Sequence, residues 1–270
     1  MLEQMLTWVK RQPKIHRLAL WFMRVSGAFE GLRDIAAIWR YPLFVRDWFR
    51  FKALGGKAPI LDFYPCLHDR MTSTGIDSHY FFQAIWGFKR IQSAQPASHV
   101  DVGSDVRWVG MLTCITRVSF IDIRPLQIQL DNYEGKAGSI VALPYSDGSL
   151  FSISSLHVIE HIGLGRYGDP LDPEGSRKAC VELMRVLAPG GKLYVSLPIG
   201  RARVQFNGQR IFSVSDVLVL FSGLELAELS IVDTLGKFHE CVSPSEVALG
   251  QAQGLDYGLG MFVFFKPAMP

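Results

Sequence analysis

Apolar and polar positions follow two different periods along most of the chain. Short apolar runs are typical of buried strands, and apolar residues spaced three or four apart are typical of helices. We expect strands at 99–102, 118–123, 139–142, 151–156, 193–198, 226–232 and 261–265, helices at 109–115, 173–187 and 213–221, and a further helix opened by Pro125. This alternation predicts an α/β fold with a doubly wound, mostly parallel sheet of seven strands.

The part of the chain before the first strand has a different organisation. Residues 1–52 have the pattern of amphipathic helices, and residues 53–75 hold the glycines and prolines of a connecting loop. Asp77 can then cap a helix over 77–92. The predicted domains are a helical appendage with its connecting loop at 1–75 and an α/β domain at 76–270.

Composition and charge add detail at the N-terminus. The 270-residue chain is 49% hydrophobic and 20% charged, so it can form a packed core. The net charge is +3, but residues 1–52 carry ten Lys/Arg against four Asp/Glu, a net +6, which leaves −3 for the rest. Basic, Trp-rich amphipathic sequence is typical of a helix at a membrane surface. Residues 1–52 are therefore predicted either to contact a membrane peripherally or to pack their apolar face on the main domain.

The basic surplus does not indicate nucleic acid as a partner, because it is confined to the appendage. The four cysteines form no CxxC pair, and isolated thiols are typical of a reducing compartment. Charged residues interrupt the apolar runs near the N-terminus, so no signal-peptide pattern is present. We expect a cytoplasmic protein, peripheral to a membrane if the appendage binds one. The sequence leaves the oligomeric state open.

Ligands of doubly wound sheets bind at the carboxyl ends of the strands, where two acidic residues stand. Gly103 follows Asp101 at the end of the first predicted strand and allows a ligand to approach the backbone closely. Asp122 lies 19 residues after Gly103, and a carboxylate there can accept both hydroxyls of an adenosine ribose. Alternatively, Asp122 caps a helix that begins at Arg124 and Pro125. The spacing fits S-adenosylmethionine or a nicotinamide dinucleotide, although the Gly-x-Gly-x-x-Gly motif of an oxidoreductase is missing.

Three further segments follow in order. They are Ala142-Leu143-Pro144-Tyr145, then Leu156-His157-Val158-Ile159-Glu160-His161, and then Leu187-Ala188-Pro189-Gly190-Gly191-Lys192-Leu193. With Asp101-x-Gly103 and Asp122, they make residues 98–200 resemble the class I S-adenosylmethionine-dependent methyltransferases of the small-molecule type. The resemblance implies a Rossmann-like methyltransferase fold with S-adenosyl-L-methionine as the cofactor.

The resemblance also implies cofactor-binding positions. These are Asp101 and Gly103 in the glycine-rich turn, Asp122 at the ribose, Ser139 and Leu143 beside the adenine, and Ser155 beneath the sulfonium. Two later glycines of the turn are replaced by Asp105 and Arg107, and Phe151 replaces the acid that usually begins the fourth strand. Asp105 could bind the amino group of the methionine part instead.

A base is expected near the transferred methyl group, because an oxygen or nitrogen acceptor must lose a proton. His157, Glu160 and His161 are spaced to share one face of a helix after the fourth strand. We expect His157 to point into the cleft as the base and His161 to point toward the core. The same residues could instead form a structural pair or hold a divalent metal, as in ubiquinone-pathway O-methyltransferases that this stretch resembles. We assign no metal.

The acceptor pocket is expected outside these motifs. Tyr80 and Trp86 lie on the helix predicted at 77–92, which corresponds to a lid helix of the family, and Arg201 and Arg210 follow the fifth strand. Several arginines suit an anionic or sugar-like acceptor.

Two functions remain open. The first is an enzyme, an S-adenosylmethionine-dependent methyltransferase that acts on an oxygen or nitrogen of a small polar, sugar-like acceptor. The second is a non-catalytic cofactor- or partner-binding protein with the same fold. Asp105, Arg107 and Phe151 favour the second, because they stand where the family has other residues.

Overall fold

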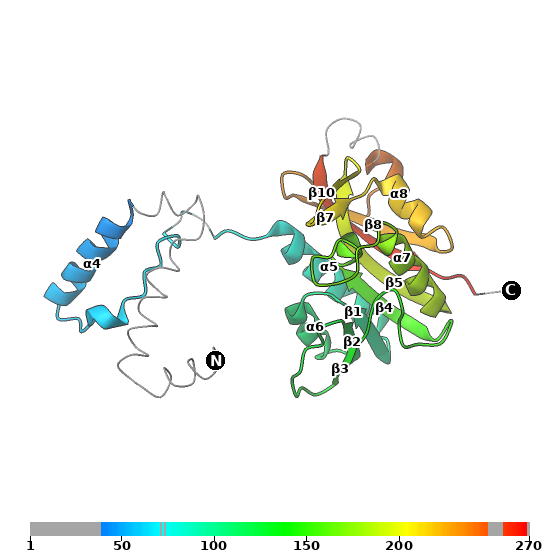
Figure 1. Ribbon diagram of the computed structural model, residues 1–270, viewed down its shortest axis with the longest axis horizontal. Coiled ribbons are helices and arrows are strands. Elements are labelled where there is room, and N and C mark those ends of the chain that lie inside the picture. Colours follow the sequence, from blue (N-terminus) through cyan, green and yellow to red (C-terminus); the bar gives the residue numbers. More distant parts are fainter. Residues whose placement is uncertain (1–38, 71, 73, 248–255, 269–270) are drawn as a thin grey trace. The chain divides into compact units, whose positions relative to one another are not determined.

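The computed structural model describes residues 39–70, 72, 74–247 and 256–268 (Figure 1). The chain divides into two compact units, residues 1–75 and 76–270. The prediction of amphipathic helices over 1–52 concerns residues that, up to residue 38, lie outside the described part.

The described part of the first unit contains α4 (Tyr41–Ala53) and the short η1 (Ile60–Asp62). Phe44 and Trp48 of α4 pack their rings edge-on against Phe63, with centroids 5.0 and 5.1 Å apart. The Trp48 Nε1–H donates to the carbonyl of Ala58 at 2.8 Å. These contacts fold the segment after α4 back onto one helix face. Among the described residues, no helix is long and apolar enough to cross a membrane.

The second unit is built on an eight-stranded sheet in the order β3-β2-β1-β4-β5-β10-β8-β9. The strands are β1 (Ser98–Val102), β2 (Arg117–Asp122), β3 (Tyr133–Ala137), β4 (Leu150–Leu156), β5 (Leu187–Gly200), β8 (Glu225–Val232), β9 (Phe238–His239) and β10 (Tyr257–Phe265). The first five pair in parallel, while β10 is antiparallel to both β5 and β8. A doubly wound, mostly parallel sheet is therefore confirmed, with eight strands rather than the seven expected.

Helices cover both faces of this sheet. They are α5 (Ser78–Ala94), α6 (Val106–Leu112), α7 (Gly175–Val186) and α8 (Val214–Leu220), with a short η2 (Ile159–His161) and a separate hairpin of β6 (Arg203–Gln205) and β7 (Gln209–Ile211). Trp86 of α5 and Trp108 of α6 belong to one buried cluster, and Leu183 of α7 and Val217 of α8 belong to the other. The second unit is therefore an α/β domain with a central sheet between two layers of helices.

The β2–β3 connection differs most from the expectation. No helix begins at Pro125, and the third strand is Tyr133–Ala137 rather than 139–142. β3 lies at the sheet edge and is largely exposed, so it lacks the apolar pattern that marks a buried strand. The apolar residues at 139–142 instead form a turn, in which Ala142 N–H donates to the Ser139 carbonyl at 3.0 Å.

Candidate active site

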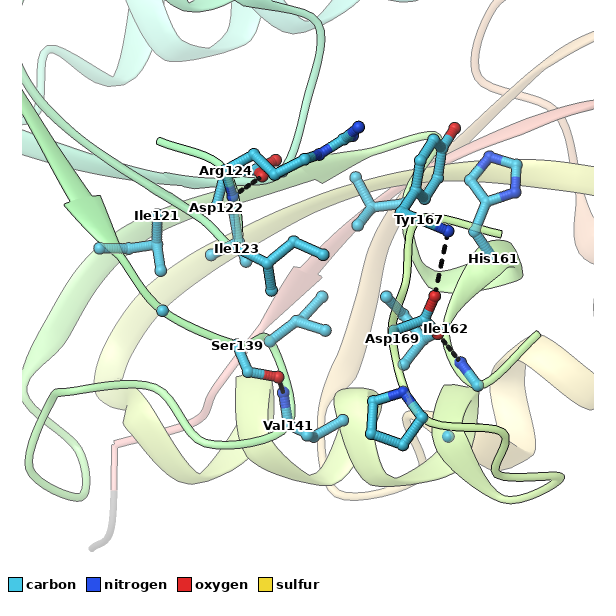
Figure 2. Close-up of a pocket in the computed structure, with 18 of the residues that line it drawn as sticks. Ile121, Asp122, Ile123, Arg124, Ser139, Val141, His161, Ile162, Tyr167 and Asp169 are labelled. Carbon is cyan, nitrogen blue, oxygen red and sulfur yellow. Dashed lines mark hydrogen bonds between the residues drawn. The ribbon is translucent and has the colours of Figure 1, made fainter. Parts of the chain in front are cut away.

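A cavity of about 250 Å³ lies at the carboxyl ends of β1, β2 and β4 (Figure 2). The strand order reverses between β1 and β4, and ligands of such sheets bind at this reversal. One wall comes from residues 121–124 and 138–141, and the other from residues 161–175 after β4. The cavity thus lies at the edge of the sheet where the sequence predicts a ligand site.

Asp122 and Gly103 form the part of the cavity between β1 and β2. Gly103 has a φ of +74°, which residues with a side chain rarely adopt. Its N–H donates to the Ile121 carbonyl at 2.9 Å. The Asp122 Oδ1 accepts from the backbone N–H of Arg124 at 2.7 Å. This local bond leaves Oδ2 available to a ligand.

Asp101 lies behind the cavity rather than in its lining. Its fully buried carboxylate accepts from Ser104 N–H at 3.1 Å, Ser104 Oγ at 2.8 Å and Trp108 Nε1 at 3.0 Å, and Ser154 Oγ also donates to it. Burial raises the pKa of Asp101 to about 6, against the opposing effect of these donors. Asp101 is therefore engaged within the protein and fixes the turn that carries Gly103.

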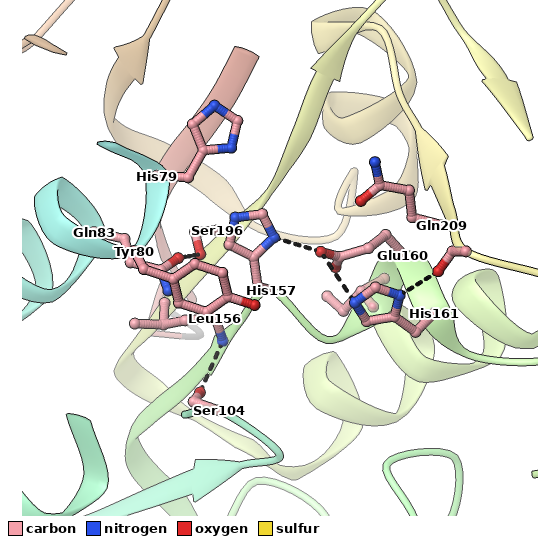
Figure 3. Close-up of polar contacts among 12 residues, drawn as sticks. His79, Tyr80, Gln83, Ser104, Leu156, His157, Glu160, His161, Ser196 and Gln209 are labelled. Atoms are coloured by element: carbon pink, nitrogen blue, oxygen red, sulfur yellow. Dashed lines mark hydrogen bonds and ion pairs between the residues drawn. The ribbon is translucent and has the colours of Figure 1, made fainter. Parts of the chain in front are cut away.

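His157 and Glu160 form a buried pair at the end of β4 (Figure 3). The His157 Nδ1 lies 2.6 Å from the Glu160 Oε1. Because a carboxylate only accepts hydrogen bonds, this contact places the imidazole proton on Nδ1 and leaves the lone pair on Nε2. Within the described residues, His157 Nε2 and Glu160 Oε2 are buried and have no hydrogen-bond partner. A polar group of a ligand or a water is expected to complete them.

The backbone at His157 departs from the predicted helix. His157 has a φ of +57°, and its N–H donates to the Ser196 carbonyl at 2.9 Å, so it precedes the single turn of η2 instead of sharing a helix face with Glu160 and His161. Such a conformation costs about 1–3 kcal/mol for a residue with a side chain and is concentrated at functional sites. His161 donates its Nδ1–H to the Gly208 carbonyl at 2.7 Å, and burial lowers its pKa. Both His157 and His161 line the cavity.

The first turn of α5 covers His157. Tyr80 and His79 stack on the His157 ring with centroids 5.0 and 5.8 Å away, and His79 also packs against Tyr257 at 5.2 Å. Burial lowers the pKa of His79 to about 4, with His157 adding to the effect, so His79 is neutral at pH 7. As predicted, Asp77 caps this helix, accepting from His79 N–H at 3.0 Å and Tyr80 N–H at 3.2 Å.

Of the other residues assigned to the cofactor, some line the cavity and others do not. Ser139 lines the cavity, whereas Leu143 and Ser155 are buried outside its lining. The Ser155 Oγ donates to the Val102 carbonyl at 3.1 Å. Asp105 caps α6 and pairs with Arg107 at 2.9 Å, which lowers the pKa of the carboxyl.

The residues assigned to the acceptor are not brought together. Trp86 is buried in the core, where its Nε1–H donates to Glu228 at 3.1 Å. Arg210 is also buried and donates to Ser176 Oγ and to three backbone carbonyls. Arg201 is exposed and pairs with Asp256 at 3.2 Å. Of this set, Tyr80 alone contacts the His157 pair.

Several cavity-lining side chains were not predicted as cofactor- or acceptor-binding residues, among them Ile123, Arg124 and Val141. Ile123 and Val141 are apolar and partly exposed, which suits the face of a flat ring. The position of Ile123 and Arg124 directly after Asp122 was a usable signal. No group of three or more His, Cys, Asp or Glu side chains in the described ranges could hold a metal ion.

Residues 97–234 match the family described as "Caenorhabditis protein of unknown function, DUF268". The chain belongs to this family. The matched segment runs from β1 to the end of β8 and so includes both walls of the cavity and the His157–Glu160 pair. No curated protein matches the chain.

Several solved structures resemble part of this chain. The [4+2]-cyclase SpnF is 13% identical, with a TM-score of 0.46 over 68% of this chain and 82% of that chain. The YcgJ protein from Bacillus subtilis is 12% identical, with a TM-score of 0.47 over 70% of this chain and 100% of that chain. The N-methyltransferase NodS from Bradyrhizobium japonicum WM9, in complex with S-adenosyl-L-homocysteine, is 16% identical, with a TM-score of 0.46 over 71% of this chain and 88% of that chain. At these values the likenesses say nothing about the activity of this chain.

Proposed function

We propose that this protein binds S-adenosyl-L-methionine in the cavity and transfers its methyl group to an oxygen or nitrogen of a small polar, sugar-like acceptor. The observation that carries the proposal is Asp122, whose carboxylate lies in the cavity beside the Gly103 turn, with no partner for Oδ2 among the described residues. A carboxylate at this point of a βαβ unit suits the hydroxyls of an adenosine ribose. Asp101 contributes by holding the turn, rather than by touching the cofactor.

The remaining lining fits an adenosyl group. Ile123, next to Asp122, and Val141 of the segment 138–141 offer apolar surface, and Ser139 adds a hydroxyl on that second segment. When bound, S-adenosyl-L-methionine supplies a methyl group that its sulfonium has already activated. The protein therefore needs to hold the two reactants in line and to accept a proton from the acceptor.

His157 is suited to accept that proton. Its Nδ1 is engaged by Glu160 at 2.6 Å, so its lone pair is fixed on Nε2, which has no partner within the described residues. Glu160 has the role of the carboxylate that orients an imidazole base and stabilises the charge it acquires. Tyr80 and His79 hold the ring plane from the α5 side.

A non-catalytic cofactor- or partner-binding protein is the second candidate. The Asp105–Arg107 pair supports this second candidate, because the two residues occupy positions where class I methyltransferases have glycines. Phe151 weighs less, since it stands near the amino end of β4, about 15–20 Å from the cavity at about 3.3 Å per residue.

Calorimetric titration with S-adenosylhomocysteine, with NAD as the matched control, tests the proposal. The proposal predicts saturable binding of S-adenosylhomocysteine at one site and no binding of NAD. Preference for NAD would favour an oxidoreductase, and binding of neither compound would contradict both the enzyme and the cofactor-binding readings.

A further inference from the structure

The two walls of the cavity are joined at its open side by an arginine and a tyrosine. Arg124 extends from the β2–β3 connection toward Tyr167 of the η2–α7 connection, and its guanidinium lies over the Tyr167 ring at 4.7 Å (Figure 2). Both side chains line the cavity and are also exposed. They therefore lie where the cavity meets solvent.

Arg124 is held by this ring. Among the described residues no carboxylate pairs with its guanidinium, although Asp122 is two residues away. A second guanidinium, that of Arg166, lies over the same ring at 5.1 Å and donates to the Gly208 carbonyl at 3.1 Å. Tyr167 is thus the common surface for two cations, and only Arg124 comes from the opposite wall.

The loop that carries Tyr167 has short backbone hydrogen bonds at its base and longer ones at its tip. At the base, Gly163 N–H donates to Asp169 Oδ2 at 2.8 Å and Asp172 N–H donates to the Gly163 carbonyl at 3.0 Å. At the tip, Tyr167 N–H and Gly168 N–H make bonds of 3.3 and 3.4 Å, near the limit for a hydrogen bond. The tip is therefore held mainly by side chains, through the Arg166 bond to Gly208 and the edge-on contact of the Tyr167 ring with His161 at 5.6 Å.

We propose that Arg124 and Tyr167 form a strap across the mouth of the cavity, which sets how fast a ligand enters and leaves. The identity of that ligand, an adenosyl compound, rests on the proposed function; the strap itself does not. An exposed cation–π contact of usual strength favours the closed state about two- to fivefold. Breaking it should speed passage in both directions by a similar factor.

A cysteine at residue 139 reports on the mouth without any ligand. In a Ser139→Cys background, N-ethylmaleimide modification is followed peptide by peptide by mass spectrometry, with the exposed Cys114 as internal reference. Tyr167→Ala and Arg124→Ala should each raise the rate at residue 139 about two- to fivefold, and the double variant should be no faster than the faster single variant. Arg107→Ala removes an exposed arginine outside the cavity lining and should change nothing.

A stopped-flow experiment with S-adenosylhomocysteine then separates a strap from an ordinary contact. A strap raises the association and dissociation rates together in Tyr167→Ala and changes Kd less than either rate. A simple binding contact raises the dissociation rate and Kd equally. Unchanged labelling of residue 139 in both single variants, or multiplied effects in the double variant, would overturn the strap. Absence of S-adenosylhomocysteine binding alongside faster labelling would overturn the proposed function and leave the strap standing.

Discussion

At the scale of single residues, a buried polar chain links β4 to the turn after β1. The His99 ring lies 2.8 Å from both Ser152 Oγ and Ser154 Oγ, and Ser154 Oγ donates to Asp101. Because the Ser154 proton points to Asp101, the His99 Nε2–H donates to Ser154 and Nδ1 accepts from Ser152. Burial lowers the pKa of His99 to about 3 and raises that of Asp101 to about 6. This set of hydrogen bonds requires His99 to be neutral.

We expect His99 to make the protein lose stability in acid. Between pH 6.5 and about 3, the unfolded chain binds a proton at His99 that the folded protein refuses, so stability falls by about 1.4 kcal/mol per pH unit. His79 acts in the same direction down to about pH 4, and Asp101 opposes them between about pH 6 and 3.8. Urea unfolding at pH 7, 6 and 5 measures how much unfolding free energy each protein loses on acidification. The loss should be smaller in His99→Gln than in the wild type, and larger in Asp101→Asn. Equal slopes in the three proteins would contradict the account.

The tautomer of His157 is a second prediction at this scale. The 2.6 Å contact with Glu160 requires the proton on Nδ1, so ¹⁵N NMR of labelled histidine should show a protonated Nδ1 and an unprotonated Nε2. The His157→Gln spectrum assigns the signal. Glu160→Gln should perturb it, whereas Glu174→Gln, at an exposed glutamate, should not. A proton on Nε2 in the wild type would remove His157 as the base in this geometry.

Once an acceptor supports turnover, the two histidines should separate in function. His157→Ala should lower the rate of S-adenosylhomocysteine formation about 100- to 10,000-fold, as expected for loss of a general base, with nearly unchanged S-adenosylhomocysteine affinity. His161→Ala should mainly lower Tm, because its ring bridges η2 to the Gly208 carbonyl of the hairpin. The reverse pattern would exchange their roles.

Sequence reasoning located both strand-end acids and could not distinguish their environments. Asp101 lies one residue before the end of β1 and Asp122 ends β2. Asp101 is surrounded by Trp108, Ser104 and Ser154, whereas Asp122 faces the cavity. The donors to Asp101 include Ser154, which is 53 residues away in sequence. Only the pairing of β1 with β4 brings it there.

At the scale of elements, the connection from η2 to α7 builds one wall of the site. Gly163, Gly165 and Gly168 all have positive φ values, of 80°, 70° and 85°. A Cβ on Gly163 would lie 2.0 Å from the Asp172 carbonyl oxygen, whereas one on Gly168 would meet nothing within 4 Å. The loop turns tightly at its base and openly at its tip.

These two glycines form a matched pair for mutation. Gly168→Ala should cost about 1–2 kcal/mol from its left-handed backbone alone. Gly163→Ala adds a clash with Asp172 and should cost at least about 2 kcal/mol more. Chemical denaturation measures both. Equal losses of stability in the two variants would mean that the backbone at the base of the loop can shift to accommodate the added methyl group.

The elements were predictable where burial imposed a period. α5 and the β1, β2, β4, β8 and β10 strands were expected near their observed places, because each carries an apolar pattern that the core enforces. β3 and β6 were missed because largely exposed strands need no such pattern, and β7 was missed because its three residues are too few to show a period. The start of α6 was expected at 109, but Asp105 caps it at Val106.

At the scale of the whole molecule, the site belongs entirely to the unit 76–270, and the role of the unit before it stays a proposal. In α4, the exposed Phe49 and Phe51 are interspersed with Arg46, Arg50 and Lys52. This combination of exposed aromatic rings and cations suits the surface of an anionic membrane.

We therefore expect the full chain to float with vesicles that contain phosphatidylserine. Arg46→Glu with Arg50→Glu should abolish the binding, since each basic residue near such a surface contributes about 1 kcal/mol. Phe206→Ser changes an exposed aromatic residue of the other unit and serves as the control. Failure of the wild type to float, or equal flotation of the charge-reversed variant, would contradict a membrane role for α4.

The most direct test of the proposed cofactor site is the affinity of Asp122 variants for S-adenosylhomocysteine, measured by calorimetry on proteins whose Tm is checked in parallel. Two hydrogen bonds from ribose hydroxyls to a carboxylate are worth about 1.5–3 kcal/mol each. Asp122→Ala should therefore weaken binding at least tenfold and leave the protein folded, while Asp131→Ala, at an exposed acid in the same connection, should bind like the wild type. Unchanged affinity in a folded Asp122→Ala protein would remove Asp122 from the site and contradict the account.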